Sequence, residues 1–341
     1  MTIKKGRSEF VEALSAYRRA FVVHDERFSL NTWEQWLPQH TEIIGSVGLV
    51  GGEETKSLQR ATELWHAFAA NKVDRKTLVL AIGGGSITDL AGFAASTYKR
   101  GLDIAFIPTT IIAMVDAAIG GKNGVNFEGI KNQIGTHHLP IAIGIDANWL
   151  DSLPEQEQIS GWMEMLKHGM LAGEEVVRQS FAVQDLGQIR SLITASAAIK
   201  STIVEADPFE SGPRKTLNLG HTVGHALEAL SHAAGQPMPH GIAIGFGLGF
   251  CLLASVECGA GLDAGAAQLG IEALQHWLKD TALLKTSPEA MWEVMQHDKK
   301  NADGQVLEVW LRNWGQAVYD QPLKFEDFQR LWLKTIATFA G

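Results

Sequence analysis

The first 150 or so residues alternate short apolar segments with helical patterns, and no other feature restricts the fold as strongly. The apolar segments are rich in β-branched residues and have the length of buried strands. Strands that alternate with helices form a mainly parallel sheet covered by helices. We therefore expect an α/β architecture, with a helix at 55–71 and strands at 20–24, 42–50, 77–82, 103–109 and 142–146.

The sequence changes character near Leu153, after which helical patterns dominate. In this second half only 306–312 looks extended, and the helical patterns cover 160–171, 189–206, 222–234 and 241–259. We expect an α/β domain over 1–152 and a mainly α-helical domain over 153–341, with the boundary in "WLDSLPEQEQ". A cleft between two such domains is a common place for a ligand.

The charge balance narrows the possible partners. A net charge of −9 argues against general binding to nucleic acid or to an anionic membrane, although one basic pocket for a small anion stays compatible with it. The N-terminal residues include basic side chains but no apolar core behind them, unlike a secretion signal. The longest apolar run, 242–256, is shorter than the roughly 18 residues of a spanning helix. We expect a cytoplasmic protein.

A glycine-rich turn in "LVLAIGGGSITDLAGFAAS" joins a buried strand to a helix. Consecutive glycines let the backbone approach a phosphate, and the helix that follows offers unpaired amides and its positive dipole end. The pattern is GGGxxxD and not the GxGxxG dinucleotide fingerprint, so a plain tight turn stays an alternative. Thr109 and Thr110 at another strand end, and Lys56 in "GGEETK", add to the signal for a nucleotide or phosphate site.

A second glycine-rich segment, 114–135, mixes glycines with Asp116, Lys122, Lys131 and Asn132. An ordinary helix would not tolerate this glycine density. We expect a loop-rich segment that presents lysines and amides to an anion, with a solvated surface loop as the alternative.

The helical half contains the candidate metal ligands. Zinc in a catalytic site takes three nitrogen or oxygen ligands and an open position. His221 and His225 lie four apart on one helix face, as do Glu164 and His168, while His240 lies in a turn. Spacing alone offers either pair as the core of a site and leaves the third ligand open. Zinc proteases carry a glutamate directly after the first histidine, where this chain has Thr222.

Eight segments in this order resemble the 3-dehydroquinate synthases of the sugar-phosphate cyclase superfamily, over about Asp25 to Gly315. They are "GGEETK", "GGGSITDLAGFAASTYKRG", "IPTTIIAMVDAAIGGK", "KNQIG", "SLPEQEQISGWMEMLKHG", "RKTLNLGHTVGHALE", "HGIA" and "HDKKN". The resemblance implies an NAD- and zinc-dependent lyase, with cobalt as another possible metal. Such an enzyme converts 3-deoxy-D-arabino-heptulosonate 7-phosphate to 3-dehydroquinate and phosphate, by oxidation, β-elimination, reduction and an intramolecular aldol closure.

The resemblance also implies roles for residues of the helical half and its neighbours. The metal ligands would be Glu164, His221 and His240, and His225 would help proton transfer. The substrate carboxylate would be held by Arg214 and Lys200, since a guanidinium grips a carboxylate bidentately. Three polar residues would surround the ring hydroxyls: Asp116, Lys167 and Asn218.

The phosphate and NAD sites are implied in the same way. The substrate phosphate would be bound by Lys122, Asn132 and either Lys299 or Lys300, with Arg100 from a neighbouring subunit, which implies a homodimer. The Rossmann-like first domain would bind NAD through Asp25, Glu53, Lys56, Gly83, Gly84, Gly85, Ser86, Ile87, Thr88, Asp89, Thr109, Thr110, Lys122, Lys131, Trp149, Leu150, Asp151 and Ser152.

Several departures from the family pattern lie in or near the second glycine-rich segment. Asn123 stands where the family usually has threonine, and "GTHHLP" replaces a more apolar run at 135–140. Three alternatives remain: another cyclase, such as an aminodehydroquinate, inosose or valiolone synthase; a glycerol-dehydrogenase-type oxidoreductase; and a silent NAD- or metal-binding protein. Arg214 and Lys200 favour a substrate with a carboxylate, and the complete ligand set argues against a silent protein.

Overall fold

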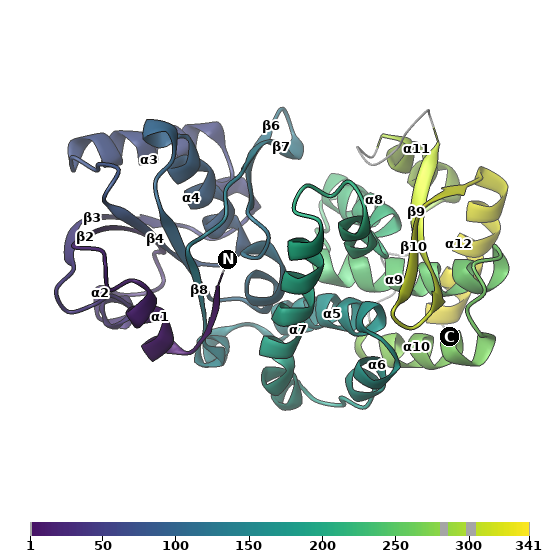
Figure 1. The fold of residues 1–341 in the computed structure, drawn as a ribbon. Coiled ribbons are helices and arrows are strands. Elements are labelled where there is room, and N and C mark those ends of the chain that lie inside the picture. The colour runs from purple at the N-terminus through teal and green to yellow at the C-terminus, as the bar shows by residue number, and fades with distance from the viewer. Residues whose placement is uncertain (1, 280–285, 298–304, 341) are drawn as a thin grey trace. The chain divides into compact units, whose positions relative to one another are not determined.

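The computed structural model describes residues 2–279, 286–297 and 305–340 and contains two compact units (Figure 1). The first unit comprises Met1–Leu153 and Ile193–Ser201, and the second comprises Pro154–Leu192 and Thr202–Gly341. The first unit thus includes part of a later helix, which a single boundary in the sequence does not anticipate.

A parallel six-stranded sheet, in the order β1-β8-β5-β4-β2-β3, forms the first unit. Its strands are β1 (Ile3–Lys5), β2 (Arg19–Asp25), β3 (Glu42–Leu49), β4 (Leu78–Gly83), β5 (Ile104–Pro108) and β8 (Ala142–Ile145). The five predicted strands are confirmed, whereas β1 was not predicted. The central strand β4 is buried along its whole length, as its unbroken apolar sequence requires.

Helices cover both faces of this sheet (Figure 1). One face carries α1 (Arg7–Ala13), α2 (Leu30–Trp33) and η1 (Glu34–Trp36), and its core includes Phe10, Trp36 and Leu80. The other face carries α3 (Leu58–Ala70) and α4 (Gly85–Thr97). There Phe21 of β2 packs edge-on against Phe68 of α3 with ring centres 5.0 Å apart.

The segment 114–135, which was expected to be loop-rich, forms mostly regular secondary structure, and this corrects the expectation. A π-helical turn, η4 (Ala113–Ala117), precedes an antiparallel hairpin of β6 (Lys122–Phe127) and β7 (Ile130–His137). The hairpin packs on α4 at Gly92, where an added Cβ would lie 1.9 Å from Asn123 Oδ1. The Asn123 side chain also donates through Nδ2 to the backbone carbonyls of Gly121 and His138, so this departure from the family pattern has a structural role.

Helices form most of the second unit (Figure 1). Its elements include α5 (Glu155–Ala172), α6 (Glu174–Phe181), α8 (His221–Ala233), α9 (His240–Glu257), α10 (Ala264–Trp277), α11 (Pro288–Gln296), α12 (Phe325–Ala340), β9 (Val306–Asn313) and β10 (Gln316–Leu323). Helix α7 (Leu186–Ala206) contributes to both units. The four predicted helical patterns are confirmed, but the expectation of one extended segment is wrong, because β10 pairs with β9. Pro322 and an irregular register in β10 conceal it in the sequence.

Helix α9 contacts α5, α8, α10, α12 and β9 and forms the core of the second unit. By length and composition it is the one helix among the described residues that could cross a membrane, and 78% of its 18-residue window is buried inside the protein. The expectation that the apolar run is too short therefore fails on length, since the helix extends beyond 242–256 at both ends. Burial against the neighbouring helices explains the apolar sequence without a membrane.

Glycines allow α9 to lie very close to α5 and α8. An added Cβ at Gly241 would lie 1.8 Å from the Ser160 carbonyl oxygen of α5. At Gly247 it would lie 2.0 Å from the carbonyl oxygen of Gly220, the residue that precedes α8. Small residues at these two positions are therefore needed for the observed helix packing.

Candidate functional site

Most residues predicted to bind NAD lie at or after the carboxyl ends of five parallel strands of the first unit, whereas Lys122 and Lys131 lie in the β6–β7 hairpin. Asp25 ends β2, the segment with Glu53 and Lys56 follows β3, Gly83–Asp89 follows β4, Thr109 and Thr110 follow β5, and Trp149–Ser152 follow β8. In the strand order, β3 lies next to β2 on one side, whereas β5 lies next to β4 on the other side, so the connections from β2 and from β4 run in opposite directions along the sheet. In open parallel sheets, ligands bind beyond the carboxyl ends of the strands at such a switch point. This topology supports the predicted cofactor site.

The glycine-rich turn leaves the N-terminus of α4 accessible to an anion. Gly84 is the N-cap of α4 and has no side chain that could cap the helix amides. An added Cβ there would lie 3.2 Å from the Thr110 side chain, and at Gly85 it would lie 3.1 Å from Ala117. Close packing against Thr110 and Ala117 thus favours glycine at both positions, as a tight turn also does, and the uncapped amides at the start of α4 suit a pyrophosphate.

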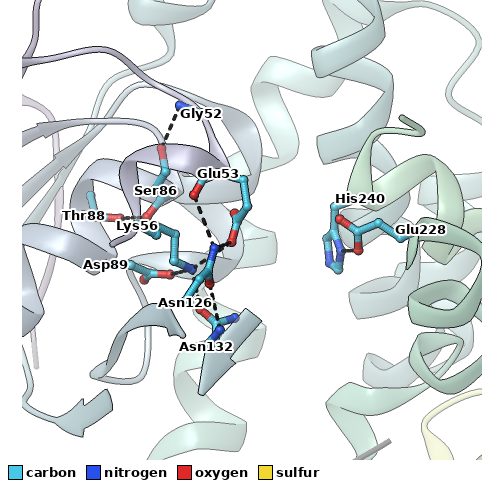
Figure 2. A network of polar contacts seen from close by, with 11 residues as sticks. Gly52, Glu53, Lys56, Ser86, Thr88, Asp89, Asn126, Asn132, Glu228 and His240 are labelled. Atoms are coloured by element: carbon cyan, nitrogen blue, oxygen red, sulfur yellow. Dashed lines mark hydrogen bonds and ion pairs between the residues drawn. The ribbon is translucent and has the colours of Figure 1, made fainter. Parts of the chain in front are cut away.

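The buried Lys56 lies at the centre of a polar network beside this turn (Figure 2). Its Nζ donates to Asp89 Oδ2 at 2.7 Å and to Asn132 Oδ1. Desolvation raises the pKa of Asp89 to about 6, and the ammonium of Lys56 limits this rise. The network brings together three residues that the sequence assigned to cofactor and phosphate.

Asn126, which the sequence analysis missed, holds the β6–β7 hairpin to the segment after β3 (Figure 2). Its Nδ2 donates to Glu53 Oε1 at 2.8 Å, its Oδ1 accepts from the Asn132 amide at 2.9 Å, and its own amide donates to the Lys56 carbonyl. An asparagine suits this position because its side chain both donates and accepts.

The other predicted cofactor residues differ in exposure. Asp25 is fully buried and accepts three hydrogen bonds from Arg27. Desolvation raises the pKa of Asp25, but these bonds and the guanidinium charge outweigh it and lower the pKa below its usual range. Trp149 packs edge-on against Phe28, and Leu150 is buried in the core, whereas Asp151 and Ser152 are exposed.

Asp116 and Lys200, both predicted to contact substrate, form an ion pair within the first unit. The Lys200 Nζ lies 2.6 Å from Asp116 Oδ1 and 2.8 Å from the Asp116 carbonyl oxygen. Lys122 and Lys131 of the hairpin are exposed, as is Arg100 in η3 (Tyr98–Arg100). Lys299 and Lys300 lie outside the described residues.

In the second unit, Glu164 of α5, His221 at the start of α8 and His240 at the start of α9 converge. Glu164 Oε1 lies 3.7 Å from His221 Nε2 and 3.5 Å from His240 Nε2. Ligands of a tetrahedral zinc ion lie about 3.3–3.6 Å apart, given bond lengths near 2.1 Å. The donor types and spacing therefore fit a zinc-like ion. His240 begins a helix and does not lie in a turn, contrary to the prediction.

His225 lies one turn beyond His221, and its ring centre is 5.3 Å from that of His221 and 5.8 Å from that of His240. The side chain of Thr222 faces a different neighbour, because its hydroxyl donates to the Leu307 carbonyl of β9 at 3.0 Å. The position that is glutamate in zinc proteases thus anchors a strand here.

Two charged residues adjoin the proposed ligands. Lys167 Nζ lies 2.5 Å from Glu164 Oε2, and both side chains are buried. Glu228 Oε2 accepts from His240 Nδ1 at 3.0 Å (Figure 2). Desolvation lowers the pKa of His240, but the carboxylates of Glu164 and Glu228 outweigh it and raise the pKa to about 10. Glu164 and Glu228 thus favour a positive charge here, either a proton on His240 or a bound metal ion in its place.

A loop before α8 fixes the predicted carboxylate-binding arginine. Arg214 is buried, its Nη1 donates to the Pro208 carbonyl at 2.6 Å, and its amide donates to Asp207 Oδ2. Asn218 Nδ2 donates to Glu210 Oε1 at 2.8 Å, and Glu210 was not among the predicted residues. Its nearness to Asn218 depends on the folded loop, so no spacing pattern could have found it.

Both halves of the chain match models of known protein families. Residues 46–160 match the family model described as 3-dehydroquinate synthase N-terminal, and residues 161–301 match the corresponding C-terminal model. The 3-dehydroquinate synthase of Parabacteroides distasonis is 34% identical over 338 residues, covering 95% of this chain and 93% of the relative. That of Pyrococcus abyssi is 40% identical over 309 residues, covering 88% of each.

Solved structures share the fold at lower identity. A 2-deoxy-scyllo-inosose synthase complexed with carbaglucose-6-phosphate, NAD+ and Co2+ has a TM-score of 0.84 at 20% identity, covering 97% of this chain and 96% of that chain. A 2-epi-5-epi-valiolone synthase of Streptomyces hygroscopicus with NAD+ and Zn2+ bound has a TM-score of 0.81 at 23% identity, covering 98% and 96%. These neighbours confirm the predicted fold class.

Proposed function

Since this chain belongs to the 3-dehydroquinate synthase family, we propose that it converts 3-deoxy-D-arabino-heptulosonate 7-phosphate to 3-dehydroquinate and phosphate in the shikimate pathway. The observation that carries the proposal is the full-length similarity to two 3-dehydroquinate synthases, together with a ligand set that combines Glu164, His221 and His240. The reaction has no net redox change, because the substrate is oxidised and later reduced.

We assign NAD to the carboxyl edge of the sheet in the first unit and a zinc or cobalt ion to the three ligands in the second. When bound, NAD supplies reversible hydride transfer and the metal supplies Lewis-acid polarisation of substrate oxygens. Asp89 and Lys56 form an ion pair that can position polar groups of the cofactor. The amides at the start of α4 are suited to its pyrophosphate.

The chain's own side chains position the substrate and move protons. Arg214 and Lys200 hold the carboxylate, and Asp116, Lys167 and Asn218 orient the ring hydroxyls. Lys122, Asn132 and Arg100 bind the phosphate and stabilise it as it leaves. His225, which is beside the proposed metal ligands but not among them, exchanges the proton of the C5 hydroxyl oxygen.

Phosphate release is the direct test. The purified chain should release phosphate from the heptulosonate phosphate only with NAD and metal present, and a chelator should abolish release. A sugar phosphate without a carboxylate, such as glucose 6-phosphate, is the control that separates this function from that of an inosose-type cyclase. Absence of release with NAD and metal supplied would overturn the proposal.

We further propose a cytoplasmic homodimer in which Arg100 completes the phosphate site of the neighbouring subunit. The exposure of Arg100 supports this role, since its side chain is available to a second chain. Mixing an Arg100→Ala variant with a His225→Ala variant should restore part of the activity, because one mixed site keeps both residues. No recovery in dimers shown to exchange subunits would exclude the shared site.

A further inference from the structure

The imidazole of His240 lies between two carboxylates. Its Nε2 is 3.5 Å from Glu164 Oε1, and its Nδ1 is 3.0 Å from Oε2 of Glu228 (Figure 2). Because an ionised carboxylate only accepts, Nδ1 must donate in this hydrogen bond. Nε2 is therefore the nitrogen whose lone pair can face a metal shared with Glu164.

The backbone around this pair is fixed by two serine hydroxyls. Ser231 donates to the Glu228 carbonyl at 2.7 Å and accepts from the Met238 amide at 3.0 Å, which ties α8 to the residues before α9. Ser160 of α5 accepts from the Gly241 amide at 2.9 Å. Glu228 itself is buried, so its contact with His240 is sheltered from water.

The other proposed histidine ligand has a different partner. His221 Nδ1 contacts the Leu219 backbone carbonyl at 3.1 Å, a neutral acceptor. A carboxylate acceptor makes the imidazole a stronger electron donor than a carbonyl does, and such partners tune metal affinity. The two histidines thus differ in charge environment, although both reach the same carboxylate.

We propose that Glu228 is a positioning residue of the metal site: its carboxylate selects the Nδ1–H form of His240 and increases the electron donation of Nε2 to the metal. This role rests on the proposed ligand set but not on the identity of the substrate. Replacing Glu228 by glutamine keeps a hydrogen-bond acceptor and removes the charge, which makes the partner of His240 similar to that of His221.

The experiment compares Zn2+ affinity by chelator competition in the unchanged chain, in Glu228→Gln and in Glu228→Ala. We expect about 10-fold weaker binding for glutamine and up to about 100-fold for alanine. With Co2+ in place of Zn2+, the visible absorption bands should shift in the glutamine variant, since the ligand field at His240 changes. Glu308→Gln is the matched control, because Glu308 is also a buried carboxylate of the second unit and accepts from Cys251 Sγ.

The outcomes separate this proposal from the function. If the unchanged chain binds no Zn2+, the ligand set and the proposal fail together. If it binds Zn2+ and both Glu228 variants bind equally tightly with unshifted Co2+ bands, only the role of Glu228 fails. A loss of affinity equal to that of Glu308→Gln would show a general effect of removing a buried charge and would also overturn the proposal.

Discussion

Replacing Gly241 by alanine tests whether close helix packing sets the geometry of the metal site. The new Cβ would lie 1.8 Å from the Ser160 carbonyl oxygen, whereas atoms in contact prefer about 3.5 Å. Helices α5 and α9 must therefore separate by on the order of 1 Å at this point. His240 precedes Gly241, so this shift changes its 3.5 Å separation from Glu164. Metal–ligand distances tolerate only about 0.2 Å.

The expected stability loss is about 1–3 kcal/mol from overpacking, reduced by about 0.5–1 kcal/mol because alanine favours a helix over glycine. We expect Zn2+ affinity to fall by about 10- to 100-fold. Urea unfolding with a chelator present measures the first effect, and chelator competition measures the second. Gly187→Ala in α7 is the control, since its Cβ would meet only the Asp185 side chain. Unchanged stability and Zn2+ affinity in Gly241→Ala would refute the reasoning.

Three further predictions follow from single side chains. His225→Ala should keep its metal and lose at least about 100-fold in turnover, whereas His221→Ala and His240→Ala should lose the metal. Equal loss of metal in all three variants would contradict this division of roles. The lowered pKa of Asp25 contributes stability above its unfolded value of about 3.9, and this is lost as the pH falls through the folded value. Asp25→Asn should therefore reduce the acid dependence of the unfolding free energy, and an unchanged slope below pH ~4 would count against this. Asn126→Ala should weaken NAD binding about fivefold in calorimetry through lost positioning, and unchanged binding would show that the hairpin anchor is irrelevant to the cofactor.

The central strands of the sheet could be predicted from the sequence, whereas the β6–β7 hairpin could not. Strands such as β4 are buried on both faces, so their apolar runs are unbroken. The strands β6 and β7 are joined by Glu128 and Gly129, both with positive φ, as a tight hairpin turn requires. Asparagine or aspartate is usual at the first of these positions, so the glutamate at 128 gives no indication of a hairpin turn in the sequence. The polar, largely exposed β7 gives little further indication.

For the metal site, helical periodicity placed His221 and His225 on one face but could not distinguish them. The distinction depends on where α9 begins, because His240 reaches Glu164 only when glycines bring α9 against α5. Glu228 escaped prediction for the same reason, since its contact with His240 joins separate helices. Such contacts are set by tertiary packing and leave no periodic pattern.

The pairing of β1 with β8 has a consequence for the order of events during folding. Ile3 lies opposite Ile143, so this edge of the sheet joins segments that leave the ribosome far apart in time. Contacts between such distant segments form slowly, because a long loop must close first. Strand β1 therefore stays unpaired until β8 has been synthesised and has paired with β5. We expect its addition to be the last step in assembling the sheet and the stage most open to proteolysis.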